Sequence, residues 1–208
     1  NIHPVDFIAN LVDEIENTDK PIKKLYIEFG EHNLTLAVGE YDDELNFKVL
    51  EKDVLKTPGY KDGEIINIEA SSNDLKKALE NIEKKTSFIF KEANIISNFS
   101  DLESVNLCGF KKLNGNQVLS EDISFILNDL RKNIIENENN KSILHLFNTK
   151  YELDKKVLKN LPIGLYGQFY SHQLTFFLTN KNNIKNIESL LNRCNLRLNR
   201  IVVKSFVE

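Results

Sequence analysis

The order of hydrophobic patterns between residues 23 and 97 constrains the fold most strongly. Three apolar, β-rich segments follow one another over short turns: 23–30 (KKLYIEFG), 32–43 (HNLTLAVGEYDD) and 44–57 (ELNFKVLEKDVLKT). Apolar residues at helical spacing begin after Ser71, and a short apolar strand occupies residues 92–97. This order predicts a β-meander that is extended by a helix and a fourth strand.

Three strands, a helix and a strand are the beginning of a ribonuclease-H-like sheet, the architecture that actin-like ATPases duplicate. Many functions use this fold, so the order alone identifies none of them. The second half of the chain predicts a strand or hairpin around Gly109 and Asn114-Gly115, a helix from Ser120, two strands, a helix over 182–195 and a last strand over 196–208. The fold class is therefore α/β, with an α+β part.

The composition excludes some classes of function. Lysines alternate with acidic and amide residues and the net charge is −4, so we expect no nucleic-acid partner. No apolar run approaches the roughly 18 residues of a membrane span, and no signal peptide is visible. The chain has no methionine, even at position 1, so we expect a piece of a longer protein.

These segments and their spacing resemble the FtsA family, the actin-like bacterial cell-division proteins. LYIEFGEHNLTLAVGE (25–40) resembles that family's first phosphate hairpin, and PGYKDGEIIN (58–67) resembles its Gly-rich loop. SILHLFNTKYELD (142–154), the PIGLYG turn (162–167) and the helix that ends in LLNRCN (190–195) resemble the subdomain that FtsA inserts into its first actin lobe. The resemblance covers most of the chain.

The resemblance implies two domains. Residues 1–100 and 200–208 would form a ribonuclease-H/actin-like first lobe with an N-terminal helix, and residues 101–199 would form an inserted small α+β subdomain. We expect residues 99–200 to fold independently. A second lobe, with the second phosphate loop, the adenosine-binding segment and a membrane-binding C-terminal helix, would lie beyond residue 208.

The resemblance also implies a function. A protein of the FtsA type links polymers of the tubulin-like FtsZ to the inner membrane, at its cytoplasmic face and at the division site, and recruits later divisome proteins. The whole protein would bind ATP and Mg²⁺ and hydrolyse ATP weakly at most. FtsZ and the membrane would contact parts outside this chain, whereas the inserted subdomain would contact later divisome proteins and other copies. For the chain itself we expect neither a cofactor nor enzymatic activity.

The candidate cofactor-binding residues lie in the corner between the first two strands: Glu28, Gly30, Glu31, His32 and Asn33. Backbone N–H groups of such a corner bind phosphates, and Gly30 would permit their close approach. Glu28 could hold a metal-bound water, but Glu31 would repel phosphate, and Asn33 stands where a cation would help. The alternative is that Gly30 marks only a turn.

No catalytic or metal site is predicted. The histidines follow no metal-ligand spacing: His3, His32, His145 and His172. We expect core or sheet-surface positions for His145 and His172, and reduced core thiols at Cys108 and Cys194. Four aromatic residues predict sheet core rather than a stacking platform, because no basic stripe surrounds them: Phe169, Tyr170, Phe176 and Phe177.

Two other classes of protein share parts of this plan. An actin-like scaffold of type IV pilus or secretion machinery would bind the tail of a membrane protein in a groove, but its phosphate hairpin is usually closer to a standard loop. A sugar kinase or chaperone ATPase would need a carboxylate base in the first lobe, and the sequence offers no distinctive one. A second lobe followed by an amphipathic helix would favour FtsA, and one without that helix would favour the pilus scaffold.

Overall fold

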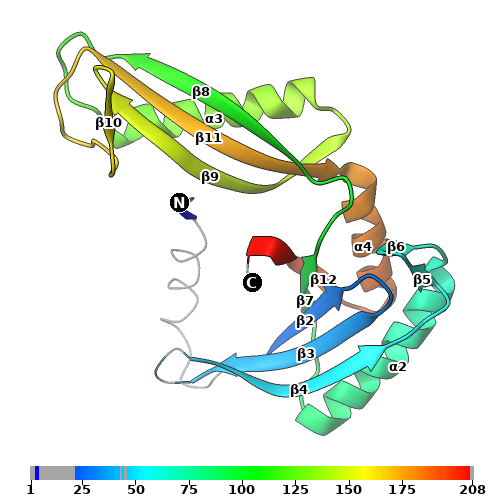
Figure 1. Ribbon diagram of the computed structural model, residues 1–208. Coiled ribbons are helices and arrows are strands. Elements are labelled where there is room, and N and C mark those ends of the chain that lie inside the picture. The colour runs from blue at the N-terminus through cyan, green and yellow to red at the C-terminus, as the bar shows by residue number, and fades with distance from the viewer. Residues whose placement is uncertain (1–2, 5–21, 43, 45, 207–208) are drawn as a thin grey trace. The chain divides into compact units, whose positions relative to one another are not determined.

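The computed structural model describes residues 3–4, 22–42, 44 and 46–206 (Figure 1). The chain divides into two compact units. Within the described part, residues 22–101 and 181–206 form the lobe, and residues 3–4 and 102–180 form the inserted unit. Each unit has its own sheet and its own apolar core.

The lobe is built on a mixed five-stranded sheet in the order β12-β7-β2-β3-β4. β2, β7 and β12 are parallel, whereas β3 and β4 are antiparallel to their neighbours. The strands of this sheet are β2 (Lys24–Phe29), β3 (Leu34–Tyr41), β4 (Phe47–Leu55), β7 (Glu92–Ser97) and β12 (Arg197–Val203). This confirms the predicted meander, its helix and its fourth strand.

Two helices cover one face of this sheet, α2 (Ile68–Thr86) and α4 (Lys181–Arg193), and a short 3₁₀ helix, η1 (Lys204–Phe206), follows β12. α2 begins where the Asn67 side chain accepts a hydrogen bond from the Ala70 amide at 3.0 Å, and ends at Ser87 in a left-handed conformation. Fully buried leucine and isoleucine side chains from the strands and helices form much of the core: Leu25, Ile27, Leu34, Leu36, Leu75, Ile82, Ile95, Leu190 and Leu191.

The inserted unit contains an antiparallel sheet with one helix on it. The strand order is β1-β9-β11-β8, and β10 also pairs with β9. The elements are β1 (His3–Pro4), β8 (Glu103–Lys112), α3 (Ser120–Asn137), β9 (Lys141–Leu153), β10 (Lys156–Leu158) and β11 (Phe169–Asn180). α3 packs closely on β8 because Gly109 has no side chain: a Cβ there would lie 2.4 Å from Ile126 Cγ2.

One predicted domain boundary is corrected by the structure. The second boundary lies between Asn180 and Lys181 rather than near Asn199. α4 therefore belongs to the lobe, where Ile187, Leu190 and Leu191 are buried in its core. The Cys194 thiol, after the end of α4, donates to the Ser72 carbonyl oxygen of α2 at 3.6 Å.

The N-terminal assignment also changes in its described part. His3 and Pro4 do not begin a helix of the lobe but form β1, which pairs with β9 of the inserted unit at Asn148 and Phe147. The rest of the predicted N-terminal helix lies outside the described residues. No helix among the described residues is long and apolar enough to cross a membrane.

Three predictions about single residues of the inserted unit need correction or refinement. Cys108 is an exposed thiol on β8 rather than a core thiol, whereas Cys194 is buried as predicted. Phe169 is exposed, although Tyr170 and Phe176 are fully buried in the core. The Gly109 region is a continuous strand, and the turn lies only at Asn114-Gly115, both with positive φ.

Candidate functional site

The predicted phosphate corner connects β2 to β3. The Gly30 amide donates to the Asn33 carbonyl oxygen at 3.0 Å, which closes a tight turn around Glu31 and His32. A Cβ at Gly30 would lie 3.0 Å from that same oxygen, so glycine suits the close approach. The structure therefore places four predicted site residues in one turn, and the Gly30 amide is engaged inside it.

The Gly-rich loop forms a second small hairpin from β5 (Tyr60–Lys61) and β6 (Glu64–Ile65). Its two-residue turn is Asp62-Gly63, and both residues have positive φ, as this turn type requires. The loop is held at Gly59, whose carbonyl oxygen accepts from the Ile66 amide at 2.8 Å. A Cβ at Gly59 would lie 2.3 Å from the Asn67 carbonyl oxygen, so no larger residue fits there without movement.

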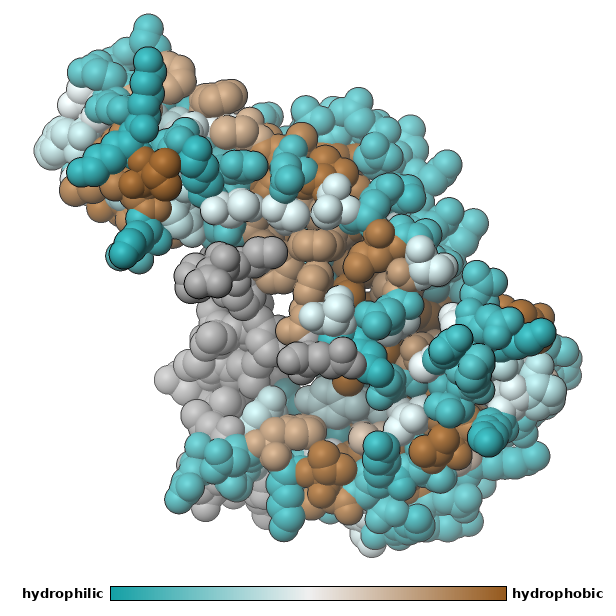
Figure 2. Space-filling view, viewed as in Figure 1, coloured by the Kyte–Doolittle hydropathy of each residue, from teal (hydrophilic) through white to brown (hydrophobic). Residues whose placement is uncertain are grey.

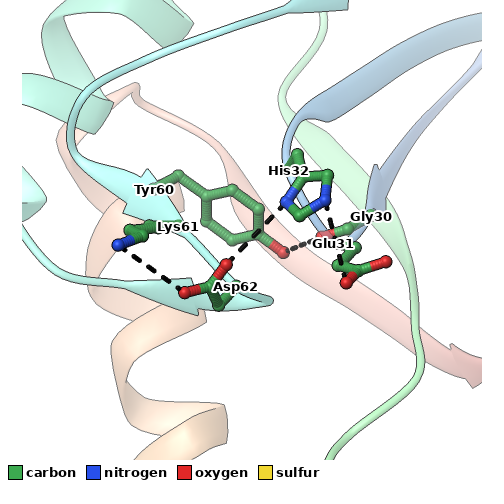
Figure 3. A network of polar contacts seen from close by, with 6 residues as sticks. All are labelled: Gly30, Glu31, His32, Tyr60, Lys61 and Asp62. Carbon is green, nitrogen blue, oxygen red and sulfur yellow. Dashed lines mark hydrogen bonds and ion pairs between the residues drawn. The ribbon is translucent and has the colours of Figure 1, made fainter.

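The corner and the Gly-rich loop are joined by two hydrogen bonds, of which Figure 3 shows the one from Tyr60 to Gly30. The Tyr60 hydroxyl donates to the Gly30 carbonyl oxygen at 2.6 Å, and the Gly63 amide donates to the Glu31 carbonyl oxygen at 2.9 Å. Burial raises the pKa of Tyr60, so its hydroxyl keeps the proton that it donates. The sequence predictions did not include Tyr60, because its partner lies thirty residues away in the chain.

The exposed side chains of this corner are mainly acidic. His32 lies between two carboxylates, with Nε2 3.7 Å from Glu31 Oε1 and Nδ1 3.8 Å from Asp62 Oδ1 (Figure 3). Lys61 Nζ approaches Asp62 Oδ2 at 3.9 Å. All four side chains are exposed, so these pairs are weak. The corner offers one lysine against two carboxylates, which does not favour a polyphosphate.

Glu28 has a partner other than a metal-bound water. Its Oε1 lies 2.8 Å from Lys204 Nζ of η1, directly after β12. This pair joins the carboxyl end of β2 to the residue after β12, and both side chains are partly buried. Among the described residues, no cluster of three His, Cys, Asp or Glu side chains is placed to hold a metal ion.

A pocket of about 150 Å³ lies at the carboxyl ends of β2 and β7 in the lobe. Its walls combine aromatic and aliphatic groups with polar ones from the Gly-rich loop, the residues after β7, and α4. The lining residues are Phe29, Gly63, Glu64, Ile65, Ser97, Phe99, Ser100, Asn183, Asn186 and Ile187. In open α/β sheets, ligands bind at the carboxyl ends of the strands. The sequence analysis does not predict this pocket, because the residues that line the pocket come from segments that are distant in sequence.

The two histidines expected in the sheet have structural positions. His172 of β11 is fully buried, and Nε2 donates to Asn148 Oδ1 at 2.6 Å, because that oxygen can only accept. Its Nδ1 accepts from the Tyr170 hydroxyl at 3.0 Å. Burial lowers the pKa of His172 to about 4 and also lowers the pKa of the partly buried His145.

No family model matches the chain. A curated relative, the cell division protein FtsA of Pseudomonas aeruginosa, is 20% identical over 178 residues, which are 86% of this chain and 42% of the relative. A solved structure, the PilM-PilN type IV pilus biogenesis complex, is 13% identical with a TM-score of 0.54, over 89% of this chain and 48% of that chain. The chain thus spans less than half the length of either protein.

The fold is that of an actin-like lobe with an inserted α+β subdomain. The mixed order of the lobe's sheet and the place of the inserted unit between β7 and α4 agree with this class. The fold prediction is confirmed. The likeness to FtsA and to the pilus complex is compatible with both scaffold functions considered from the sequence.

Proposed function

We propose that this chain is the first lobe and inserted subdomain of a cell-division scaffold of the FtsA type. The whole protein would link FtsZ polymers to the cytoplasmic face of the inner membrane at the division site and recruit later divisome proteins. The single observation that carries this proposal is the match to FtsA, which extends over 178 residues and so includes residues of both units. The inserted unit, with its own sheet and core, is the part that would contact later divisome proteins and other copies.

The test is localisation and partner binding of the whole protein that contains this chain. A fluorescent fusion should form a ring at the division site, and the whole protein should bind the FtsZ C-terminal tail. Deleting residues 102–180 should abolish recruitment of later divisome proteins while leaving FtsZ binding in place. A fusion that never reaches the division site, in cells whose FtsZ ring is normal, would refute the proposal.

A second candidate is an actin-like scaffold of type IV pilus or secretion machinery. It is favoured by the likeness to the PilM-PilN complex, which covers 89% of the chain. The lobe pocket, with Phe29, Phe99 and Ile187 beside Asn183 and Asn186, would then receive the short tail of a membrane protein. Substituting Asn186→Leu should weaken binding of such a tail and leave FtsZ binding unchanged, which distinguishes the two candidates.

The whole protein would use ATP and Mg²⁺ in assembly, but the described corner supports only weak binding by this chain. Glu31 and Asp62 oppose the charge of a polyphosphate, and Asn33 adds no cation. Titration calorimetry of the chain with ATP and Mg²⁺ should show no site tighter than about 10 µM, which corresponds to about −7 kcal/mol. We also expect no hydrolysis.

The control for this prediction is the double variant Glu31→Gln with Asp62→Asn. It removes the two carboxylates without changing the shape of the turn, so any residual affinity for ATP should rise in it. Micromolar binding by the unaltered chain would show that the corner is a working phosphate loop.

A further inference from the structure

One end of the inserted unit has an unusual composition. Residues 155–170, which follow β9 through β10 to the start of β11, contain three lysines and no acidic residue. The whole chain, by contrast, carries a net charge of −4. Lys155, Lys156 and Lys159 are exposed, and no ion pair to them is found in the described part of the chain. We call residues 155–170 the basic tip.

The basic tip also exposes large apolar side chains. Tyr166 is 72% exposed and Leu165 is 51% exposed. The exposed apolar residues of the tip are Val157, Leu161, Ile163, Leu165, Tyr166 and Phe169. Hydrophobic side chains stand among hydrophilic ones at the end of the unit that carries β10 (Figures 1 and 2). Such a concentration on a short segment indicates an interaction surface.

Several backbone amides between residues 164 and 169 of the basic tip are already hydrogen-bonded. The amides of Gly164 and Gly167 donate to the carbonyl oxygens of Val118 and Asn116, and the Leu165 amide donates to Pro162. Asp154 Oδ1 accepts from the amides of residues 168 and 169, both at 2.8 Å. A partner peptide therefore cannot pair as an added strand with these amides. These hydrogen bonds hold the backbone that carries the exposed side chains, so little backbone entropy is lost when the tip binds a partner.

We propose that the basic tip docks on the surface of an anionic lipid bilayer. Exposed aliphatic side chains and a tyrosine can enter the boundary between head groups and acyl chains. Lysines with long aliphatic stems keep their ammonium groups at the level of anionic phosphates, and each adds to the attraction. No acidic side chain within residues 155–170 opposes this attraction, and the neighbouring Asp154 carboxylate accepts hydrogen bonds from the amides of residues 168 and 169. This contact is additional to the C-terminal helix that the resemblance to FtsA implies, and it does not depend on the proposed function.

The experiment is flotation of the 208-residue chain with vesicles. Vesicles of phosphatidylglycerol and phosphatidylcholine in equal parts should bind the chain, and pure phosphatidylcholine vesicles should not. Binding should fall steeply with added salt, because the lysine contribution is screened. Lys155→Glu with Lys156→Glu should reduce the partition coefficient by at least about tenfold, and Leu165→Asp should do so by a similar factor.

Matched controls lie on α3 of the same unit. Ile135 is 55% exposed, an exposed fraction similar to the 51% of Leu165, but it lies outside the basic tip. Ile135→Asp should therefore retain vesicle binding. Arg131 and Lys132 are exposed, and Arg131→Glu with Lys132→Glu is the control for the double charge reversal. Thermal melts of all variants should match the unaltered chain, because the changed side chains are exposed.

Two results would overturn the proposal. Either the chain binds neither kind of vesicle, or the tip variants and the α3 controls lose binding equally. A chain that binds neither kind of vesicle can then be tested with a peptide of alternating leucine and glutamate. If the chain binds this peptide and Leu165→Asp abolishes the binding, the basic tip is a docking surface for an acidic protein segment, and the lipid proposal is wrong.

Discussion

At the scale of single residues, His172 makes stability depend on pH. Its folded-state pKa of about 4 lies below the usual 6.5 because burial disfavours the charged ring. The unfolded chain therefore binds more protons between these values, and the free energy of unfolding falls as the pH is lowered from about 6.5 to 4. The loss should be at most about 3 kcal/mol for this residue. Urea unfolding of the chain at a series of pH values measures it.

Two variants isolate this effect. His172→Gln should flatten the pH dependence, although it lowers stability at neutral pH because the hydrogen bonds to Asn148 and Tyr170 change. His32→Gln is the comparison variant, since it removes a histidine whose side chain is 70% exposed rather than one buried in the core. If His172→Gln keeps the slope of the unaltered chain, the buried ring does not stay neutral in the folded state.

Ser71 gives a second prediction at this scale. Its hydroxyl oxygen is buried and has no hydrogen-bond partner within the described residues. The residue lies inside α2, where alanine is the better helix former. Ser71→Ala should therefore leave the free energy of unfolding unchanged or raise it by up to about 1 kcal/mol. Ser72→Ala, a change to a neighbour whose hydroxyl does donate to Glu69, should not stabilise the chain. A clear loss of stability in Ser71→Ala would mean that this hydroxyl has a partner after all.

At the scale of elements, the approach of α3 to β8 depends on Gly109. A Cβ there meets Ile126 Cγ2 at 2.4 Å, so α3 must move or the two side chains must strain. Gly109→Ala should lower the free energy of unfolding by about 1–3 kcal/mol. In a double-mutant cycle, Gly109→Ala should destabilise the Ile126→Ala variant less than it destabilises the unaltered chain. The coupling energy should exceed about 0.5 kcal/mol. If the losses of stability in Gly109→Ala and Ile126→Ala simply add, the contact between residues 109 and 126 is not the source of the strain.

Elements were easier to predict from the sequence than their partners. The alternation of Leu34, Leu36 and Val38 marks β3 and its buried face, because side chains of a strand alternate between the two faces of the sheet. The apolar stripe of α4 likewise predicts which side is buried. It does not say which unit receives that side, so the predicted boundary near Asn199 places α4 in the inserted unit, whereas the structure places it in the lobe.

The same limit applies to the candidate site. The Gly30 turn and the Asp62-Gly63 turn are local signals, and both are found in the structure. The Tyr60 hydrogen bond to Gly30 and the ion pair of Glu28 with Lys204 join segments that are far apart in sequence, so no local pattern encodes them. Cys108 is a case in which the local pattern misleads. Its apolar neighbours predict a core position, but the alternation of side chains along β8 places it on the exposed face.

At the scale of the whole molecule, the corrected boundary predicts which piece folds independently. The core of the inserted unit is closed by α3 and the sheet, without any residue of α4. Residues 102–180 should therefore melt cooperatively as an isolated chain. The longer piece, residues 99–200, adds α4 without α2 and the lobe sheet that cover it, and so exposes Ile187, Leu190 and Leu191 to water.

Thermal melts and light scattering of the two pieces test this boundary directly. We expect residues 102–180 to be monomeric, and residues 99–200 to associate with increasing concentration through the uncovered face of α4. Substituting Leu190→Lys and Leu191→Lys in the longer piece should restore a monomer, because the charges remove the apolar stripe that drives association. In the full chain the same substitutions should be strongly destabilising, since both side chains are fully buried in the lobe. A monomeric 99–200 with a higher melting temperature than 102–180 would instead show that α4 packs on the inserted unit, and the boundary would return to the end of the helix.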